Sequence, residues 1–435
     1  MDKVLMDKVS VVIGRFQPFH LGHVKMIETA LQETNKVIVI VGSSNKQNTK
    51  ENPCAVKTRI EMIRNWLHLK GVEDRVEIKT LKDRKHYSEI GYGDYIVKKC
   101  KLNPNKTIFV MGDDSIRESW FSAKLKDKLE FIKLTRESLP ISGTMVRDYL
   151  ITTYDGLYGL YQYIPQGVSL EPYRIFRERL LEVTLEERFG ARDLVSKDTI
   201  YKLLEFVRNN VPQNTKAIIG ISGGKDSTVN AALIRLALPK GSLIGVRMPQ
   251  GEQHDLDVAQ KVCELLNIES YEVNIKSTCD SLKRVIKTSL GKDPLKYPVY
   301  KSNTPARIRM TTLYGIAAML GGRVVNTCNR SEDYVGYSTK WGDSVGDFSP
   351  LSDFTATEVI DIGIKLGIPG GFLFKKPEDG LSGKTDEDNM GFTYKELDNY
   401  ILFHKKPEHL EKIESMHKAG LHKLSMPPRF KKGEK

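Results

Sequence analysis

The chain has 435 residues, of which 40% are hydrophobic and 28% are charged, and its net charge is +12. This length exceeds what one ordinary core requires, so we expect two domains, and the composition is that of a globular protein rather than a disordered or fibrous one. No stretch approaches the ~20 uncharged apolar residues of a membrane-spanning helix, and the charged N-terminus lacks the apolar core of a signal peptide.

The lysines and cysteines exclude further classes of protein. Lysines are scattered along the chain, and no basic stripe is interleaved with stacking aromatic residues, so neither a nucleic-acid nor a membrane partner is expected. The five cysteines contain no C-x-x-C pair, which argues against a disulfide framework and a zinc knuckle. We expect them to be small, buried or half-buried residues of a cytoplasmic protein.

The first half of the chain alternates short β-branched runs with amphipathic stretches. The runs that we interpret as buried strands are residues 9–14, 36–43, 75–81, 106–112 and 130–134. Between them, residues 24–34 and 56–68 carry apolar side chains at helical spacing. Strands that alternate with helices predict a parallel sheet covered on both faces, with ligands bound at the carboxyl ends of the strands.

A segment rich in tyrosine, glycine and proline, residues 151–172, separates the two halves, and a charged stretch at 173–192 that is expected to be helical follows it. The second half then repeats the alternation. Its predicted strands are residues 216–222, 242–248, 271–275 and 323–327, and its predicted helices are 227–237, 255–266 and about 306–320. We therefore expect two tandem Rossmann-like α/β domains at 1–168 and 195–435, joined by a connector at 169–194.

The first predicted strand ends in the motif G-R-F-Q-P-F-H-L-G-H, residues 14–23. Its two histidines stand at the start of a helix, where the macrodipole is positive and backbone N–H groups can bind an anion. Imidazoles placed there can stabilise the charge that develops on a triphosphate during attack at its α-phosphorus. A lone H-x-G-H can also be a surface turn, but its position after a buried strand and beside Arg15 favours a phosphate site.

A second motif, I-S-G-T-M-V-R at 141–147, follows the last strand of this half. A plain helix cap explains it equally well when it is taken alone. Together with H-x-G-H, however, it resembles the nucleotidyltransferase superfamily over residues 1–168, and within it the archaeal type of nicotinamide/nicotinate mononucleotide adenylyltransferase. The family's N-P-F-T-x-x-E-R reads NPCAVKTR here, so Cys54 and Thr58 depart from the pattern.

This resemblance implies two sets of contacts in the first half. ATP would be contacted by Gly14, Arg15, Phe16, His20, His23, Ser142, Thr144 and Arg147. The mononucleotide would be contacted by Asn52, Arg59, Asp114 and Trp120. Of these residues, His20, His23 and Arg147 would be catalytic.

The strand predicted at 216–222 opens directly into S-G-G-K-D-S, residues 222–227, and then into a helix. Successive glycine N–H groups can form an anion nest with the helix dipole behind it. The hexamer differs from the G-x-x-x-x-G-K-[ST] loop and resembles the ATP-pyrophosphatase loop, which splits ATP between its α- and β-phosphates. That loop also serves guanylate synthesis, argininosuccinate synthesis and tRNA thiolation, so it leaves the reaction open.

Several downstream motifs select among these reactions. They are NTPARIRM (303–310), NTCNRSE (326–332), GYSTKWGD (336–343), Asp347 with Pro350-Leu351, TDED (385–388) and the terminal His422-Lys423 with Pro427. In this order they resemble ammonia-dependent NAD synthetase over nearly all of 195–435.

The synthetase resemblance again implies site residues. ATP would be bound by Ser222, Gly223, Gly224, Lys225, Asp226, Ser227 and Thr327, and deamido-NAD by Arg307, Lys340, Asp347, His422 and Lys423. Asp226 and Glu332 would hold Mg²⁺, a hard cation that prefers carboxylate oxygens, and Asp226 and Lys340 would be catalytic.

Two positions depart from the synthetase pattern. Ala356 stands where the family usually has an ATP-binding lysine, and Glu378 where it commonly has a small hydroxyl residue. Either ATP binding is weaker in this chain, or Lys375, Lys376 or Lys384 supplies the missing charge.

The two halves together predict a bifunctional enzyme of NAD biosynthesis. The first would adenylylate nicotinate (or nicotinamide) mononucleotide with ATP, and the second would amidate the resulting deamido-NAD with a further ATP and ammonia. The fusion favours nicotinate mononucleotide, because only the deamido product feeds the second site. No segment remains for a glutaminase, so free ammonia is expected, and the resemblance implies a homodimer through the synthetase domain.

Two alternatives remain. One is a pantetheine-phosphate or flavin type of nucleotidyltransferase beside a tRNA-modifying half, against which the missing C-x-x-C and the segment SEDYVGYSTKWGD (331–343) speak. The other is a nucleotide-sensing regulator with an impaired second site, a version that Ala356 keeps open although no length remains for a DNA-binding output module.

Overall fold

The computed structural model of the protein describes residues 7–83, 89–112, 119–135, 137, 140–251, 256–375, 385–428 and 430. The chain divides into two compact units, Met1–Thr184 and Leu185–Lys435. The division falls inside helix α7 (Glu171–Phe189), which occupies most of the charged segment that was predicted to be helical.

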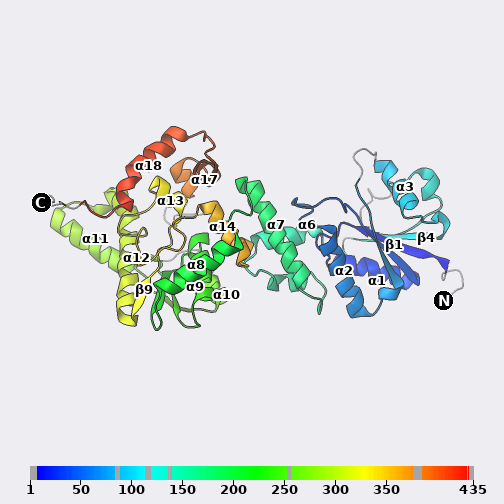
Figure 1. The fold of residues 1–435 in the computed structure, drawn as a ribbon, viewed down its shortest axis with the longest axis horizontal. Coiled ribbons are helices and arrows are strands. Elements are labelled where there is room, and N and C mark those ends of the chain that lie inside the picture. The colour runs from blue at the N-terminus through cyan, green and yellow to red at the C-terminus, as the bar shows by residue number, and fades with distance from the viewer. Residues whose placement is uncertain are drawn as a thin grey trace. The chain divides into compact units, whose positions relative to one another are not determined.

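The first unit is built on a five-stranded parallel sheet in the order β3-β2-β1-β4-β5 (Figure 1). Its strands are β1 (Val9–Gly14), β2 (Lys36–Val41), β3 (Val76–Thr80), β4 (Thr107–Gly112) and β5 (Glu130–Leu134). All five predicted strands are present, and the parallel α/β class is confirmed. The β-branched runs form strands because both faces of a covered parallel sheet are apolar.

Helices cover both faces of this sheet. They are α1 (Leu21–Glu33), α2 (Val56–Lys70), α3 (Glu89–Lys99), α5 (Ala123–Lys126) and α6 (Gly143–Thr152), with short 3₁₀ turns η2 (Glu73–Arg75), η3 (Pro104–Lys106) and η4 (Tyr158–Gln162). Helix α1 packs against β1, β2 and β4, whereas side chains of α3 pack on the opposite face. Helix α1 begins three residues before the predicted start at 24, because His20 caps its first turn.

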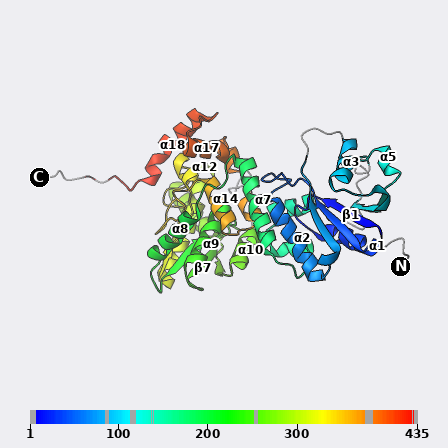
Figure 2. The same ribbon diagram turned by 45° about the vertical axis from the view of Figure 1, so that its right-hand side comes forward.

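The second unit contains a four-stranded parallel sheet in the order β8-β7-β6-β9. Figure 2 shows the ribbon from a second side, with β7 labelled. Its strands are β6 (Lys216–Gly220), β7 (Leu243–Arg247), β8 (Glu269–Glu272) and β9 (Gly322–Val324). The predicted strand at 271–275 was shifted, since pairing with β7 begins at Glu269. The predicted strand at 323–327 was too long, because Asn326 bonds instead to the Phe348 carbonyl.

The second sheet is likewise covered on both faces. The helices of this unit are α8 (Lys197–Asn210), α9 (Lys225–Ala237), α10 (Leu256–Leu266), α11 (Lys276–Leu290), α12 (Pro298–Leu320), α13 (Arg330–Val335), α14 (Ala356–Lys365), α15 (Gly370–Leu373), α16 (Asp386–Met390), α17 (Tyr394–Phe403) and α18 (Leu410–Leu424), with a 3₁₀ turn η5 (Pro294–Lys296). Helix α12 starts eight residues earlier than predicted, and Pro305 lies inside it rather than before it. Helices α9 and α12 both pack on β6.

The order of the strands fixes where ligands can bind. In each sheet the chain turns to the other side of its first strand, between β1 and β4 and between β6 and β9. In open parallel sheets the binding crevice lies at this switch point, beyond the carboxyl ends of the strands. The segments that follow β1 and β6 are the two motifs that the sequence singled out. Within the described ranges no helix is both long and apolar enough to cross a membrane.

Candidate active sites

The two histidines of the first motif lie side by side at the start of α1. The Nδ1 atom of His20 accepts the Gly22 N–H at 3.2 Å, the His20 N–H donates to His23 Nδ1 at 3.3 Å, and the ring centroids are 3.8 Å apart. Because both Nδ1 atoms accept, each neutral ring carries its hydrogen on Nε2. The pair therefore offers N–H donors at a helix N-terminus, where an anion is favoured.

His20 is held in its neutral form. Only 4% of its surface is exposed, and burial together with the nearby Arg147 lowers the pKa of its imidazole to about 4. At neutral pH, His20 is a hydrogen-bond donor without charge.

This shift predicts a pH dependence of stability. Between the ordinary pKa of 6.5 and the folded value of about 4, the unfolded chain binds a proton that the folded chain does not, so stability falls as the pH falls. From pH 8 to pH 5 we expect this group to lower the free energy of unfolding by about 2 kcal/mol. Urea unfolding followed by tryptophan fluorescence should show this extra loss in the natural chain and not in His20→Asn; equal losses would contradict it.

The second motif of this unit packs against the first. Arg147 donates from Nη1 to the Gln17 carbonyl at 2.8 Å and from Nη2 to Thr144 Oγ1 at 3.0 Å, while Ser142 Oγ caps α6 by accepting the Met145 N–H at 3.2 Å. A Cβ atom on Gly143 would lie 3.0 Å from the Gln17 carbonyl oxygen, so glycine is needed for this close approach. The structure thus brings together the ATP contacts that the sequence predicted at 14–23 and 141–147.

Arg59 lies beneath these loops and is fully buried. Its guanidinium donates to the carbonyls of Arg15 at 3.0 Å, Gly42 at 2.8 Å and Ser43 at 3.1 Å, and burial lowers its pKa to about 10. These bonds tie together the chain beyond β1 and β2. Arg59 therefore holds these two loops together, and its contact with the mononucleotide stays a prediction.

The other predicted mononucleotide residues are spread over the unit. Asn52 is buried, and its Oδ1 has no hydrogen-bond partner among the residues that the structure describes. Trp120 packs edge-on against Tyr92, with 5.0 Å between ring centroids, and Asp114 lies outside the described residues. The two positions that depart from the family, Cys54 and Thr58, line a cavity of about 320 Å³. Its other lining residues are Gln47, Asn48, Pro53, Ala55, Ile175 and Arg179.

Two aromatic residues explain the shape of the first loop. Phe16 has a positive φ of 54°, and its ring centroid is 4.6 Å from that of His23. A Cβ atom on Gly14 would lie 3.2 Å from the Phe16 ring, so a side chain at position 14 would push this ring away.

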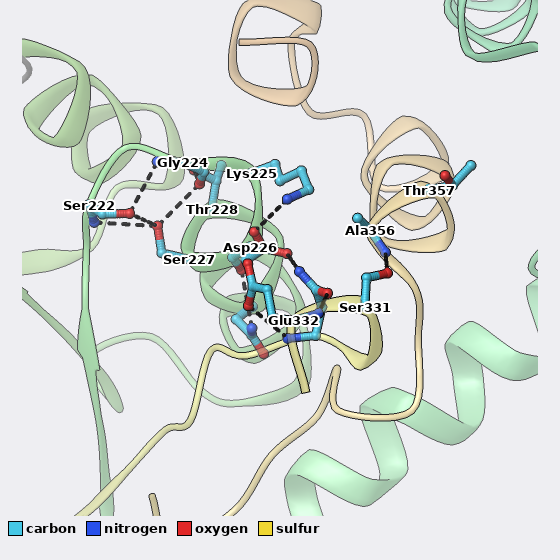
Figure 3. A network of polar contacts seen from close by, with 12 residues as sticks. Ser222, Gly224, Lys225, Asp226, Ser227, Thr228, Ser331, Glu332, Ala356 and Thr357 are labelled. Carbon is cyan, nitrogen blue, oxygen red and sulfur yellow. Dashed lines mark hydrogen bonds and ion pairs between the residues drawn. The ribbon is translucent and has the colours of Figure 1, made fainter. Parts of the chain in front are cut away.

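In the second unit, hydroxyl groups of the loop after β6 form hydrogen bonds within the loop (Figure 3). Ser222 Oγ accepts the Gly224 N–H at 3.2 Å and lies 3.1 Å from Ser227 Oγ. Gly223 has φ +81°, and a Cβ atom there would lie 3.0 Å from the Ala259 nitrogen. Only glycine fits both conditions, and the loop presents the N-terminus of α9 as an anion site.

Two carboxylates stand beside this loop, bridged by Asn329. The Asn329 Nδ2 donates to Asp226 Oδ1 at 2.9 Å, and its backbone N–H donates to Glu332 Oε2 at 3.3 Å. Burial and the Asp226 carboxylate raise the pKa of Glu332 well above its ordinary value. A divalent cation would relieve this repulsion, and its ligands would be hard oxygen atoms, so the pair fits Mg²⁺. No cluster of three or more His, Cys, Asp or Glu side chains that could hold a metal ion occurs among the described residues.

Four of the five residues predicted to bind deamido-NAD are connected by hydrogen bonds to one another or to neighbouring backbone, and Asp347 lies apart from them. Arg307 Nε donates to the Lys340 carbonyl at 3.2 Å, Lys340 Nζ donates to the His422 carbonyl, and Lys423 Nζ donates to the Gly336 and Ser338 carbonyls. Asp347 lies instead at β9, where it accepts the Val324 N–H at 2.7 Å. Thr327, the predicted ATP-binding residue outside the 222–227 loop, is half-buried in the segment between β9 and α13.

Ala356 is fully buried at the first position of α14, where it packs with apolar side chains of α13, α16 and α17. Its N–H donates to Ser331 Oγ at 2.8 Å. The other departing position, Glu378, lies outside the described residues, as do Lys376 and Lys384.

Sequence reasoning missed two residues that build this site. Asn329 is fully buried and forms a capping box with Glu332, a signal visible in the sequence as N-x-x-E. Asp398 accepts hydrogen bonds from the Ser331 hydroxyl and from the Thr357 N–H at 2.8 Å, and burial raises its pKa to about 6. Asp398 joins α17 to α13 and α14, and no local sequence pattern predicts these contacts.

The comparisons with known proteins agree with this geometry. The NAD synthase family model matches residues 199–427, and the cytidylyltransferase-like model matches residues 11–169. The NH(3)-dependent NAD(+) synthetase of Pyrococcus furiosus is 39% identical over 211 residues, which are 48% of this chain and 79% of that protein. That of Thermoplasma acidophilum is 37% identical over 54% of this chain and 97% of its own length.

A solved structure of NMN synthetase from Francisella tularensis is 32% identical with a TM-score of 0.50, and the match covers 55% of this chain and all of that one. The predicted synthetase and nucleotidyltransferase halves are confirmed. The chain belongs to the NAD synthase family and carries a cytidylyltransferase-like domain ahead of its synthase domain, which makes it a bifunctional enzyme of NAD biosynthesis.

Proposed function

We propose that the first unit joins ATP and nicotinate mononucleotide into deamido-NAD and pyrophosphate, and that the second converts deamido-NAD, ATP and ammonia into NAD, AMP and pyrophosphate. The observation that carries the proposal is the presence, in one chain, of two strand–loop–helix segments, one beside a histidine pair and one beside a carboxylate pair. Only the deamido product of the first reaction is a substrate for the second.

In the first unit, a phosphate oxygen of the mononucleotide attacks the α-phosphorus of ATP, and pyrophosphate leaves. The attacking oxygen is already ionised, so catalysis needs positioning and charge stabilisation rather than a general base. The Nε2–H groups of His20 and His23, the Arg147 fork and the first N–H groups of α1 are donors of the kind that stabilises the developing charge. Arg59 and Gln17 hold the surrounding loops in place through hydrogen bonds to their backbone.

In the second unit, the carboxylate of deamido-NAD attacks the α-phosphorus of a second ATP, which releases pyrophosphate and leaves an acyl adenylate. Ammonia then attacks the acyl carbon, AMP leaves, and the nitrogen loses a proton. The loop N–H groups at 222–225 would bind phosphate, and the Lys340, Arg307 and Lys423 group would neutralise the dinucleotide pyrophosphate. Asp226 and Glu332 would hold Mg²⁺, which neutralises triphosphate charge when bound.

Separate assays of the two units test this proposal. Mg-ATP with nicotinate mononucleotide should give deamido-NAD, and Mg-ATP with deamido-NAD and ammonium should give NAD and AMP. The quoted relatives are NH(3)-dependent synthetases, which supports ammonia as the donor. Glutamine in place of ammonium should therefore give no NAD; amidation at an unchanged rate with glutamine would contradict a free-ammonia enzyme.

A second candidate reverses the order of the two steps. The solved relative from Francisella tularensis is an NMN synthetase, so the second unit here could amidate the mononucleotide before the first unit adenylylates it. His20→Asn separates the two orders. Given nicotinate mononucleotide, Mg-ATP and ammonium, this variant accumulates NMN under the reversed order, and under the order that we propose it forms NAD slowly and no NMN.

We propose further that the chain is a cytoplasmic homodimer through its synthase domain. Helices α11 and α12 expose several apolar side chains, including Val285 at 61%, Leu290 at 66% and Met319 at 84%. Exposed apolar side chains of this size are typical of a protein interface where they adjoin one another. All five cysteines are buried, as predicted, which suits a reducing compartment.

Val285→Glu with Leu290→Glu should therefore weaken the dimer. Two carboxylates buried in the core of an interface lose their hydrogen bonds to water, which weakens association. We therefore expect the dimer dissociation constant to rise at least about thirtyfold. Sedimentation equilibrium measures it directly. Leu236→Glu, at an exposed leucine of α9, is the matched control and should change nothing. An unchanged constant in the double variant would place the interface elsewhere.

A further inference from the structure

We propose that Lys225 is a built-in counter-cation: it holds Asp226 in place of the metal ion while the synthase site lacks nucleotide, and it passes to the ATP phosphates when Mg-ATP binds. The inference rests on the proposed function in naming Mg-ATP as the ligand. Its first prediction, on metal binding alone, does not depend on turnover.

Lys225 pairs with Asp226, one of the two predicted metal ligands. Its Nζ lies 2.8 Å from Asp226 Oδ2, while Oδ1 of the same carboxylate accepts the Asn329 Nδ2–H at 2.9 Å. Both oxygens are thus engaged by protein donors, and Figure 3 shows the Lys225 side chain directed at Asp226. A metal ion that binds Oδ2 must share this oxygen with the ammonium group or displace it.

The Lys225 side chain is almost completely buried. Its side chain is 7% exposed, its Nζ lies 5.2 Å from the centroid of the Tyr394 ring, and Glu332 is also close enough to act on its charge. A buried ammonium is costly unless it is paired, so this placement requires the acidic pair. The hydroxyl of the same tyrosine is buried and has no hydrogen-bond partner among the described residues, which marks a polar group available to a ligand.

The charges explain what the lysine does. Asp226 and Glu332 carry two negative charges when ionised, and Lys225 offsets one of them. A divalent cation arriving alone must compete with this ammonium for Asp226. When the cation arrives with a triphosphate, the ammonium gains a new anion at the same loop, so the exchange costs little. Lys225 therefore couples metal binding to nucleotide binding.

Mn²⁺ binding to the full chain without nucleotide, followed by the electron paramagnetic resonance of free Mn²⁺, tests this inference. Lys225→Met removes the charge and keeps the length of the side chain. We expect it to bind Mn²⁺ at least about tenfold more tightly than the natural chain at this site, because a competing cation is lost. Lys225→Arg keeps the charge and should bind Mn²⁺ as the natural chain does.

The matched control is Lys202→Met on α8, where Lys202 Nζ lies 2.7 Å from Asp198 at the surface. It loses the same kind of ion pair and should leave Mn²⁺ affinity unchanged. The KM for ATP in the amidation of supplied deamido-NAD should rise about tenfold in Lys225→Met, since a phosphate contact is lost.

Mn²⁺ affinity in Lys225→Met that equals or falls below that of the natural chain would overturn the inference. If that variant does not fold, Lys225→Gln gives the same test with a polar side chain. A chain whose Mn²⁺ affinity responds as expected but which never amidates deamido-NAD would refute the proposed reaction and leave the counter-cation standing.

Discussion

Asp226→Asn stops the chain at deamido-NAD. The substitution keeps the shape of the side chain and its bond to Asn329 but removes the charge that the carboxylate pair offers to a divalent cation. Because the ion would no longer be held against the triphosphate, we expect NAD formation to fall by about a thousandfold. Adenylylation of the mononucleotide should be unchanged, since it takes place in the other unit.

Chromatography of the products over time measures both rates in one sample. Asp198→Asn, at an exposed aspartate of α8 paired with Lys202, is the control and should convert deamido-NAD at the natural rate. NAD formation by Asp226→Asn within a few-fold of the natural chain would show that the pair with Glu332 is structural.

His20→Asn gives the opposite result. Asparagine is a good N-cap, so it can keep the bond to the α1 backbone that His20 makes, but it lacks the Nε2–H donor. We expect adenylylation to fall by a factor of about a hundred to a thousand, as for other lost transition-state donors, while supplied deamido-NAD is amidated normally.

His20→Ala separates the chemistry from the cap. It removes the donor and the cap together, so it should lose the same activity and, in addition, about 1 kcal/mol of stability. Urea unfolding measures that difference between the two variants. Full adenylylation by His20→Asn would contradict a catalytic role and leave His20 as a capping residue only.

The strands and the glycine loops were predictable because each is encoded locally. The run VSVVIG forms β1 at the predicted residues, since a continuous β-branched run can be satisfied only by a strand buried on both faces. The loop at 222–224 was visible for the same kind of reason: Gly223 has a backbone conformation and a close neighbour that exclude a side chain.

The remaining features depend on partners far apart in the chain. The pattern indicated a cation at Arg59, but only the fold shows that three backbone carbonyls take up its guanidinium. Strand β8 has no buried residue, so pairing with β7 rather than its own side chains decides where it starts. Asp398 meets Ser331 across 67 residues, and no local signal encodes such a contact.

The most direct test of two reactions in one chain follows ¹⁵N-ammonium and nicotinate mononucleotide with Mg-ATP and the purified protein. We predict that deamido-NAD appears first and NAD second, with ¹⁵N in the carboxamide, two pyrophosphates and one AMP per NAD. Deamido-NAD that accumulates without NAD, or NMN that precedes any dinucleotide, would contradict this account of the second site.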